Sequence, residues 1–448
     1  MKSTKINAPA IIAGSFIGVI VLGAILLSLP MSTVQDGSMP LLDALFTSTS
    51  AVCVTGLTVV DTGTAFTKFG QIVILGLIQI GGLGIMTLST FFLVLLGKRL
   101  QMKDLFVIEG SLGQSSVQGV KGLVKYCLFA TIGIEVIGAL VLFLRFFLHY
   151  DFPLARSIYY AFFHSISAFC NAGFALFPDN LCSFRQDWIV LCVIAFLIIF
   201  GGLGFVVLLN VNSYKFWEKN RLKKGKLRLH TKIVLLMTII LLFGGAIGFL
   251  ALEWNGTLRG LPLHDKLTNS FFQSTTPRTA GYNALVIGDM SQAALCLTLF
   301  LMFVGGAPGS TAGGIKVSTF MVLLVNAYGI IKGKIDLQLF NRTIPKRVVQ
   351  EATCVLAIST GIVFICTMGL LISERDFDFM KITYEAVSAF ANVGLSTGIT
   401  PDLSNIGKSL IIILMFVGRI SPLTMALVVG RKEEYGVIRY PMESVMVG

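Results

Sequence analysis

Four short segments centred on a glycine recur along the chain and could together bind a bare cation. Each has two residues, then the glycine, then a large apolar or aromatic residue, and the glycines at positions 56, 173, 281 and 394 are separated by 117, 108 and 113 residues. Glycine reaches positive φ without a Cβ clash, so such a segment can turn successive backbone carbonyls toward one axis. Rings of carbonyls can replace the hydration shell of a monovalent cation. The repeated spacing therefore predicts a carbonyl-lined cation filter.

The predicted filter consists of each glycine and the two residues before it. These residues are Val54, Thr55, Gly56, Asn171, Ala172, Gly173, Thr279, Ala280, Gly281, Asn392, Val393 and Gly394. The bulky residues that follow (Leu57, Phe174, Tyr282 and Leu395) are expected to pack behind each turn, and four acids farther on (Asp61, Asp179, Asp289 and Asp402) are expected to concentrate cations at the mouth. A single copy would be typical of an ordinary interhelical turn, but four aligned copies indicate a repeat.

A second glycine-rich stretch, residues 305–316, interrupts a long apolar segment. It holds five glycines and a proline in twelve residues, a composition that cannot continue a helix. Irregular backbone at membrane depth must be buried by protein or line a watery cavity. We hypothesise that it is a gate below the filter, formed by Gly305, Gly306, Gly309, Ser310, Thr311, Gly313, Gly314, Lys316 and the distant Arg419. A permanently open kink between two short helices is the alternative, and the sequence leaves it open.

Three charged residues outside this stretch lie at predicted membrane depth. Arg419 is flanked by apolar sequence, and an arginine there faces the interior of the bundle with partners, so we expect it to bond to carbonyls of the loop or to add a cationic barrier. Glu135 either shares this role or pairs within the bundle. Arg278 is expected to point away from the ion toward a neighbouring carboxylate. The glycine runs 81–84 and 201–204 are expected to bend or pack closely, which leaves the sixth span as the one broken helix.

Composition predicts an integral membrane protein. Hydrophobic residues make up 55% of the 448 residues and charged residues 13%, about half the charged share of a typical soluble domain. Eight stretches are long enough, at about 20 residues each, to span a bilayer. They lie near 10–30, 71–96, 122–148, 188–213, 231–253, 289–330 (interrupted), 352–373 and 406–430. The first is interpreted as a retained span rather than a cleaved leader.

The net charge of +12 is concentrated in three loops and does not indicate nucleic-acid binding. Residues 98–125, 215–232 and 332–347 hold 18 of the 35 basic residues and four of the 23 acids. Such loops lie on the cytoplasmic side by the positive-inside rule. With an even number of spans, both termini are expected in the cytoplasm, and the lipid bilayer is the expected surroundings.

The predicted fold is all-α, with four parallel membrane–pore-loop–membrane repeats around one central pore. It has eight transmembrane helices and four re-entrant pore helices, because the segments 41–51, 158–169, 266–275 and 384–390 are too short to cross a bilayer. The expected repeats are residues 1–100, 101–214, 215–335 and 336–430, followed by a cytoplasmic tail, 431–448.

These motifs resemble the Trk/Ktr/HKT superfamily of potassium transporters, and most closely its Ktr-type membrane subunits. The matching strings are VTGLTVVDTG, FCNAGFALFPDNL, TPRTAGYN, GGAPGSTAGGIK, FANVGLSTG and FVGRISPLT. The resemblance covers nearly the whole chain and implies potassium uptake across a bacterial cytoplasmic membrane, a gate at residues 305–314 and a contact of that loop with Arg419. It also implies a homodimer under a cytoplasmic ring of RCK-type nucleotide-binding subunits (KtrA/KtrC-like). No cofactor is expected in this chain, and sodium activation stays open.

Two rival functions predict other sequence features. An alternating-access secondary transporter for another cation would have inverted repeats and a midplane site on broken helices. A polytopic membrane enzyme would have clustered His, Asp or Glu at membrane depth, yet the four histidines are scattered. The eight cysteines show no CxxC pair and are interpreted as packing residues.

Overall fold

The computed structural model describes residues 8–34, 37–84, 117–214, 227–334 and 336–420. Within these ranges the protein is mainly α-helical, and its one small sheet pairs β1 (Gln338–Leu339) antiparallel with β2 (Arg342–Thr343). The predicted tail at 431–448 and parts of the spans expected at 71–96 and 406–430 lie outside the described residues.

Four short helices precede the four glycine segments, at the places where the sequence predicts re-entrant helices. Three of them begin directly after a proline, whose fixed φ suits a helix start and whose missing N–H would be unpaired there anyway. The four helices are α2 (Leu41–Val52), α8 (Leu154–Phe169), α12 (Leu263–Thr275) and α16 (Phe379–Ala391). Each ends within the four residues that precede its glycine segment, so the chain turns there.

Three helices of the described chain are long and apolar enough to cross a membrane alone: Tyr126–Leu148 within α7 (Val117–Leu148), α11 (Leu229–Leu252) and α15 (Lys346–Ser373). The prediction of eight such spans is therefore not met by the described residues. The other predicted spans fall on shorter helices or run into residues outside the described ranges. The shorter helices are α1 (Ala8–Leu27), α4 (Lys68–Leu83), α9 (Trp188–Leu203), α13 (Gln292–Phe303), α14 (Val317–Ile331) and α17 (Asn405–Ile420).

Within the described residues, the helix that follows the glycine segment is broken in two repeats, and not in one as the sequence suggests. Helix α9 ends at Leu203, and α10 (Phe205–Asn212) leaves at an angle of 96°. Gly204 between them has φ = 85°, a backbone conformation that favours glycine. Helices α13 and α14 are separated by the glycine-rich loop, as predicted. The remaining short elements are α3 (Thr62–Ala65), η1 (Pro30–Ser32), η2 (Cys182–Phe184) and η3 (Ile287–Asp289).

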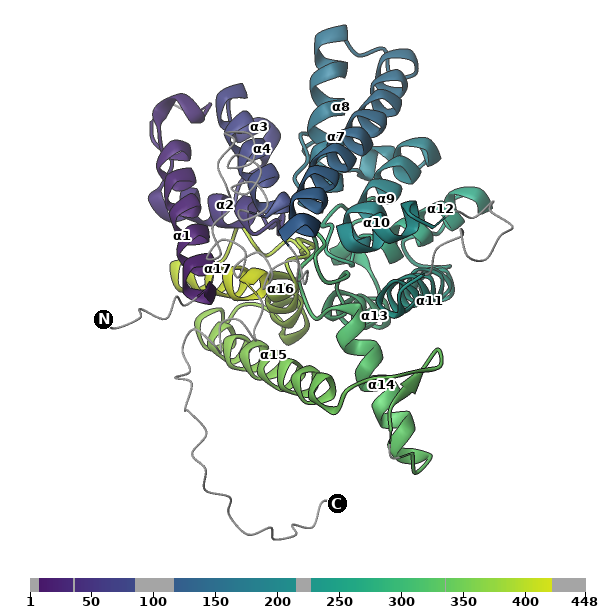
Figure 1. The fold of residues 1–448 in the computed structure, drawn as a ribbon. Coiled ribbons are helices and arrows are strands. Elements are labelled where there is room, and N and C mark those ends of the chain that lie inside the picture. The colour runs from purple at the N-terminus through teal and green to yellow at the C-terminus, as the bar shows by residue number, and fades with distance from the viewer. Residues whose placement is uncertain (1–7, 35–36, 85–116, 215–226, 335, 421–448) are drawn as a thin grey trace.

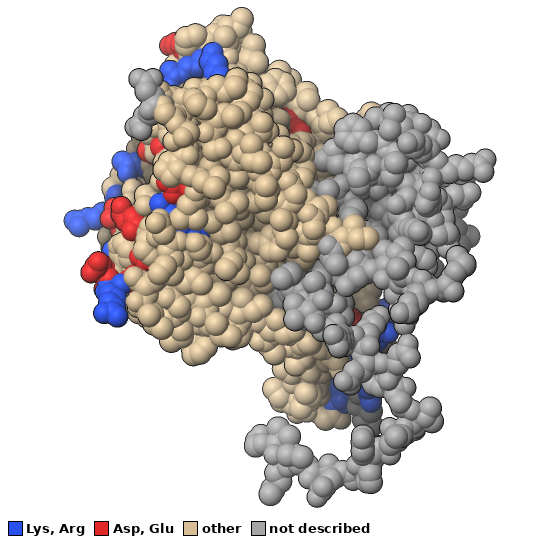
Figure 2. Space-filling view, turned by 90° about the vertical axis from the view of Figure 1, so that its left-hand side faces the viewer, with Lys and Arg blue, Asp and Glu red and all other residues tan. Residues whose placement is uncertain are grey.

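The helices follow one another around a common centre. In Figure 1 the chain passes from α1 and α2 through α7 to α9 and then α11, and its last described helix, α17, lies beside α2. The outward sides of the long helices are apolar: Ile137 on α7, Ile247 on α11 and Ile365 on α15 are 66%, 67% and 70% exposed. On the face shown in Figure 2, a broad area carries almost no charged residue, and Lys, Arg, Asp and Glu lie mainly toward one edge. Such a surface is suited to contact with lipid.

Candidate functional site

The backbone of all four glycine segments has the same unusual conformation. The glycines Gly56, Gly173, Gly281 and Gly394 have φ of 94°, 69°, 75° and 89°. The first residues of the segments, Val54, Asn171, Thr279 and Asn392, also have positive φ, between 52° and 72°. For β-branched residues such as Val54 and Thr279 this conformation is a genuine outlier. Strain of this kind persists where the surroundings enforce it, often at functional sites.

The four segments form a closed ring in which each glycine packs on the next segment. A Cβ atom on Gly56 would lie 2.5 Å from the Ala172 carbonyl oxygen, and one on Gly173 would lie 2.7 Å from that of Ala280. A Cβ atom on Gly281 would lie 2.5 Å from the carbonyl oxygen of Val393. One on Gly394 would collide with the carbonyl oxygen of Thr55, which returns to the first segment. All four glycines line a single cavity of about 410 Å³.

Hydroxyl groups at the ends of the short helices fix the ring from behind. The Ser50 Oγ accepts a hydrogen bond from the Gly56 amide (3.0 Å), and the Ser388 Oγ accepts one from the Gly394 amide (3.1 Å). The Ser167 hydroxyl donates instead to the Phe174 carbonyl oxygen (2.9 Å). These serines are not among the predicted site residues, although a Ser lies six positions before three of the four glycines, and a Thr lies six positions before Gly281.

Side chains also link one segment to another. The Asn392 Nδ2 donates to the Thr55 Oγ1 and to the Met415 carbonyl oxygen, both at 2.9 Å. The Asn171 side-chain amide lies 3.3 Å from the Thr279 Oγ1, and the Tyr282 hydroxyl donates to the Phe174 carbonyl oxygen at 3.0 Å. The bulky residues after the glycines are all buried: Leu57, Phe174, Tyr282 and Leu395. The ring is thus supported by packing as well as by hydrogen bonds.

The loop between α13 and α14 lies directly against the ring. Its two ends are joined by a bridge between Val304 and Ile315 and by a 2.9 Å hydrogen bond from the Gly305 amide to the Ile315 carbonyl oxygen. A Cβ atom on Gly313 would lie 2.6 Å from both the Ala391 carbonyl oxygen and the Asn392 Oδ1. The loop is therefore packed against the fourth segment with no space for a larger residue at position 313.

Two basic side chains bind this loop. The Arg419 guanidinium donates to the carbonyl oxygens of Thr311 in the loop and Gly81 on α4. The Lys316 Nζ donates to the Ala312 carbonyl oxygen at 2.6 Å. The structure therefore brings together the loop and Arg419, which are 108 residues apart at this contact, and places two positive charges at the level of the loop.

Glu135 and Arg278 do not contribute to the ring. The Gln79 Nε2 donates to the two carboxylate oxygens of Glu135 at 3.2 and 3.3 Å, so Glu135 pairs within the bundle. The Arg278 Nη2 donates to the Thr238 Oγ1 at 3.3 Å. Within the described residues no carboxylate is paired with Arg278, so the expected partner is not found there. The nearest acceptor depends on which helix packs there, and the sequence does not give this.

The outer acids divide into two groups. Asp61 and Asp179 line the cavity that the four glycines share, whereas Asp289 lines a separate cavity and Asp402 lines neither. The expectation that all four acids concentrate cations at the mouth stays a prediction. In the described chain no cluster of three or more His, Cys, Asp or Glu could hold a metal ion, and the eight cysteines are free.

Comparison with known proteins finds that the chain is similar to cation transporters. The family described as TrkH, cation transport protein, matches residues 7–435. The chain is 43% identical over 450 residues to the Ktr system potassium uptake protein B of Bacillus subtilis (strain 168), an alignment that covers 100% of this chain and 98% of that protein. It is 39% identical over 450 residues to the potassium/sodium uptake protein NtpJ of Enterococcus hirae, covering 99% and 98%.

Two further relatives extend the comparison to a second Ktr protein and to a solved structure. The Ktr system potassium uptake protein D of Bacillus subtilis is 38% identical over 429 residues, covering 96% of this chain and 94% of that protein. The crystal structure of the potassium transporter TrkH from Vibrio parahaemolyticus matches with a TM-score of 0.74 over 96% of this chain and 86% of that one. At 18% identity this last likeness shows the fold.

Proposed function

The chain belongs to the TrkH family of cation transport proteins, as a Ktr-type membrane subunit, and from this premise we propose that it conducts potassium into a bacterial cell through the ring of four glycine segments. The family consists of cation transporters. At this general level, membership supports the expectation that the chain is not an enzyme. The family resemblance read from the motifs is confirmed. The channel-like mechanism, the filter and the gate are our proposals.

The closed ring of backbone is the observation that carries the filter proposal. The carbonyl oxygens of Thr55, Ala172, Ala280 and Val393 each lie against a glycine of the neighbouring segment, beside the cavity that the four glycines share. A potassium ion that enters this ring exchanges water oxygens for peptide oxygens. Asp61 and Asp179 on the cavity wall raise the local cation concentration.

The proposed architecture is four parallel repeats around one pore. Each of the four glycine segments is preceded by a short helix and followed by a second helix, in the same order each time, which supports repeats at 1–100, 101–214, 215–335 and 336–430. The basic loops support cytoplasmic termini. The same order in every repeat differs from the inverted repeats that are typical of the rival class, the alternating-access transporters.

The loop at 305–314 is proposed as the gate. It packs against the fourth segment through Gly313 and is bound by Arg419, so that a displaced loop would open the path and a bound one would block it. The charges of Arg419 and Lys316 add an electrostatic barrier to cations in the closed state.

Regulation and assembly are proposed from the likeness to Ktr proteins. We expect a homodimer under an RCK-type nucleotide-binding ring, and potassium as the substrate ion with no resident cofactor. The name of the NtpJ relative includes sodium as well as potassium, which supports a test of sodium both as substrate and as activator.

The filter is tested by uptake in a bacterium that lacks its own potassium uptake systems. Wild type, Gly56→Ser and Gly281→Ser are compared on limiting potassium, with the amount of each protein in the membrane measured in parallel. We expect both variants to lose growth and potassium-over-sodium preference. Normal growth and unchanged preference in both variants would refute the filter.

The gate and the conduction mode need two more measurements. Deletion of part of residues 306–313 is expected to raise potassium flux, and unaltered flux would count against a gate. Purified protein in planar bilayers should show step-like currents that reverse at the potassium equilibrium potential. Stoichiometric uptake without such currents would favour the alternating-access transporter.

A further inference from the structure

One junction of the ring differs from the other three. Successive segments are joined along the chain from the first to the fourth, whereas the fourth meets the first with no peptide connection. At this closing junction Gly394 packs on the Thr55 carbonyl oxygen, and α17 packs against α2 (Figure 1). Non-covalent contacts alone must therefore keep the ring closed there.

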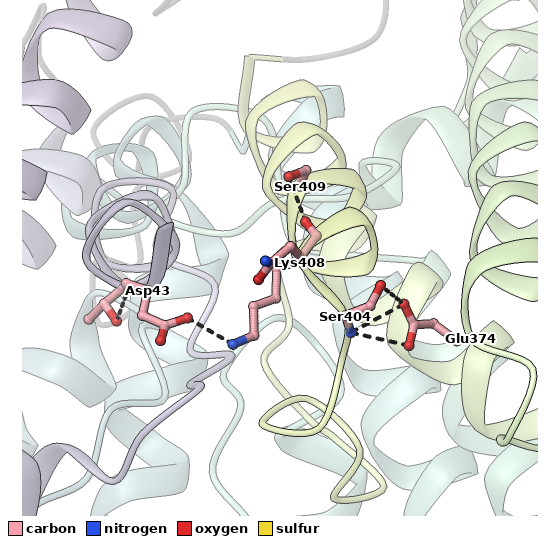
Figure 3. Close-up of polar contacts among 7 residues, drawn as sticks. Asp43, Glu374, Ser404, Lys408 and Ser409 are labelled. Carbon is pink, nitrogen blue, oxygen red and sulfur yellow. Dashed lines mark hydrogen bonds and ion pairs between the residues drawn. The ribbon is translucent and has the colours of Figure 1, made fainter. Parts of the chain in front are cut away.

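An ion pair crosses the closing junction. The Lys408 Nζ on α17 lies 2.8 Å from the Asp43 Oδ1 on α2, and the two side chains are only 13% and 20% exposed. Figure 3 shows Lys408 extending from α17 toward Asp43. Among the residues that the structure describes, it is the one ion pair between different repeats, because the others join Arg145 to Asp187, His264 to Asp265 and Arg347 to Glu351.

The dipole of α17 alone does not favour a lysine at position 408. Lys408 lies in the first turn of α17 (Asn405–Ile420), where the helix dipole disfavours a positive charge. Asp43 lies in the first turn of α2, where the dipole favours a negative charge. The pair thus brings a lysine to an unfavourable helix end because a carboxylate of the first repeat lies opposite it there.

The start of α17 is also held from its other side. The Glu374 carboxylate, at the end of α15, accepts hydrogen bonds from the Ser404 amide (3.3 and 3.2 Å) and from the Ser404 hydroxyl, as Figure 3 shows. Ser404 Oγ in turn accepts from the Gly407 amide at 3.1 Å. Glu374 anchors the first turn of α17 within the fourth repeat. A force that acts on Lys408 is therefore transmitted to the rest of that repeat.

Two more side chains of the fourth repeat form hydrogen bonds across the closing junction. The Asn392 Nδ2 bonds to the Thr55 Oγ1 and also to the Met415 carbonyl oxygen on α17, and Arg419 in the last turn donates to the Gly81 carbonyl oxygen. In each of these hydrogen bonds across the junction, the donor atom belongs to the fourth repeat and the acceptor atom to the first. Lys408 and Asp43 form the ion pair of this set, at the opposite end of α17 from the loop.

We propose that Asp43 and Lys408 are positioning residues that clamp the fourth repeat to the first and thereby hold the first and fourth glycine segments at the spacing that favours potassium. This inference rests on the proposed filter. Neither side chain lines the cavity of the four glycines, so both act through the ring and not on the ion. Loss of the pair should relax ion preference more than it lowers the amount of folded protein.

The test compares potassium and sodium uptake in charge variants of the pair. Asp43→Asn and Lys408→Gln are expected to lower the potassium-over-sodium ratio about tenfold, which corresponds to about 1.4 kcal/mol of lost discrimination. The exchanged pair, Asp43→Lys with Lys408→Asp, should restore most of the ratio because it rebuilds the ion pair with opposite polarity.

Arg145→Gln provides the matched control. It breaks an ion pair of the same 2.8 Å length, with Asp187, that lies within the second repeat. We expect this variant to change the amount or thermal stability of the protein in the membrane but not its ion ratio. If single variants do not reach the membrane, the double variant Asp43→Asn with Lys408→Gln, which leaves no unpaired charge, should still show the lowered ratio.

The outcomes separate this inference from the filter itself. A normal ratio in the Asp43 and Lys408 variants, together with a lost ratio in Gly56→Ser, overturns the clamp and leaves the filter standing. Failure of the exchanged pair to restore the ratio, at normal protein amounts, also overturns it. A normal ratio in Gly56→Ser refutes the filter and the clamp together.

Discussion

At the scale of single residues, the ring needs glycine for two separable reasons, conformation and space. Gly394 and Gly398 both have positive φ, 89° and 98°, so any side chain is strained at either position. Only Gly394 also lacks space, since its Cβ would collide with the Thr55 carbonyl oxygen, whereas a Cβ at Gly398 would meet nothing within 4 Å. The two positions therefore form a matched pair.

We predict that Gly394→Ala abolishes potassium uptake and that Gly398→Ala retains most of it. Both substitutions carry the conformational cost of about 1–2 kcal/mol for a left-handed residue, but only the first displaces a carbonyl oxygen of the ring. Uptake of a potassium tracer, normalised to the protein in the membrane, measures the difference. Equal losses in both variants would show that backbone strain alone, and not the ring contact, explains the need for glycine.

Some residue roles could be predicted from sequence and others could not. The four glycine positions follow from their spacing, because a repeated backbone requirement leaves a repeated residue type. The partner of Arg278 could not be predicted, since Thr238 is 40 residues away on a helix whose rotation the sequence does not give. Ser50 and Ser388 were missed because a serine near a helix end is common in any turn.

At the scale of elements, the sequence predicts which segments are helical better than where those helices end. The short helices α2, α8, α12 and α16 can be predicted, since each is a half-hydrophobic segment too short to cross a bilayer and a glycine segment follows it. The break after α9 was not foreseen. Its glycine run resembles that at 81–84, where α4 also ends before a glycine of positive φ, Gly84 at 80°. After Gly204 the Phe205 amide donates to the Gly309 carbonyl oxygen at 3.2 Å.

We predict that Gly204→Ala changes the rate of potassium conduction by disturbing this break. Gly204 has φ = 85°, and a Cβ there would lie 2.9 Å from the Pro308 carbonyl oxygen in the loop. A side chain at this position strains the backbone by about 1–2 kcal/mol and pushes on the loop, so we expect a raised flux if the loop is the gate. Tracer flux into cells or vesicles measures it.

Gly133→Ala on α7 is the control for this prediction. Gly133 is a helical glycine, and a Cβ atom there would meet nothing within 4 Å, while alanine favours a helix by about 1 kcal/mol over glycine. Unchanged flux in Gly133→Ala is expected. Unchanged flux in Gly204→Ala as well would mean that the α9–α10 break and the loop act independently.

At the scale of the whole molecule, the sequence could predict four repeats but not how the ring closes. Asp43 and Lys408 are 365 residues apart, and neither residue differs in type from many exposed charges of the chain. The pairing of Asp43 with Lys408 can be inferred only after the four repeats have been arranged in a circle. The same arrangement places Cys182 of the second repeat on the wall of the cavity that all four glycines share, where it can report which side of the membrane the cavity faces.

We predict that a charged, membrane-impermeant methanethiosulfonate slows potassium uptake only when added outside, by modifying Cys182. Burial, and then the nearby charge of Asp179, raise the pKa of the Cys182 thiol to about 11. The reactive thiolate is therefore scarce at neutral pH, and the rate of modification should rise about tenfold for each unit of external pH between about 7 and about 9.

Cys182→Ser should be protected from the reagent, and saturating external potassium should slow the reaction in wild type because ions in the cavity compete with a cationic reagent for the same space. The other cysteines remain in Cys182→Ser, so the comparison isolates one thiol. Inhibition that appears only from the cytoplasmic side would reverse the proposed orientation of the cavity, since the positive-inside distribution of the basic loops predicts that the cavity faces outward. Equal inhibition of wild type and Cys182→Ser would instead place the sensitive thiol elsewhere in the chain.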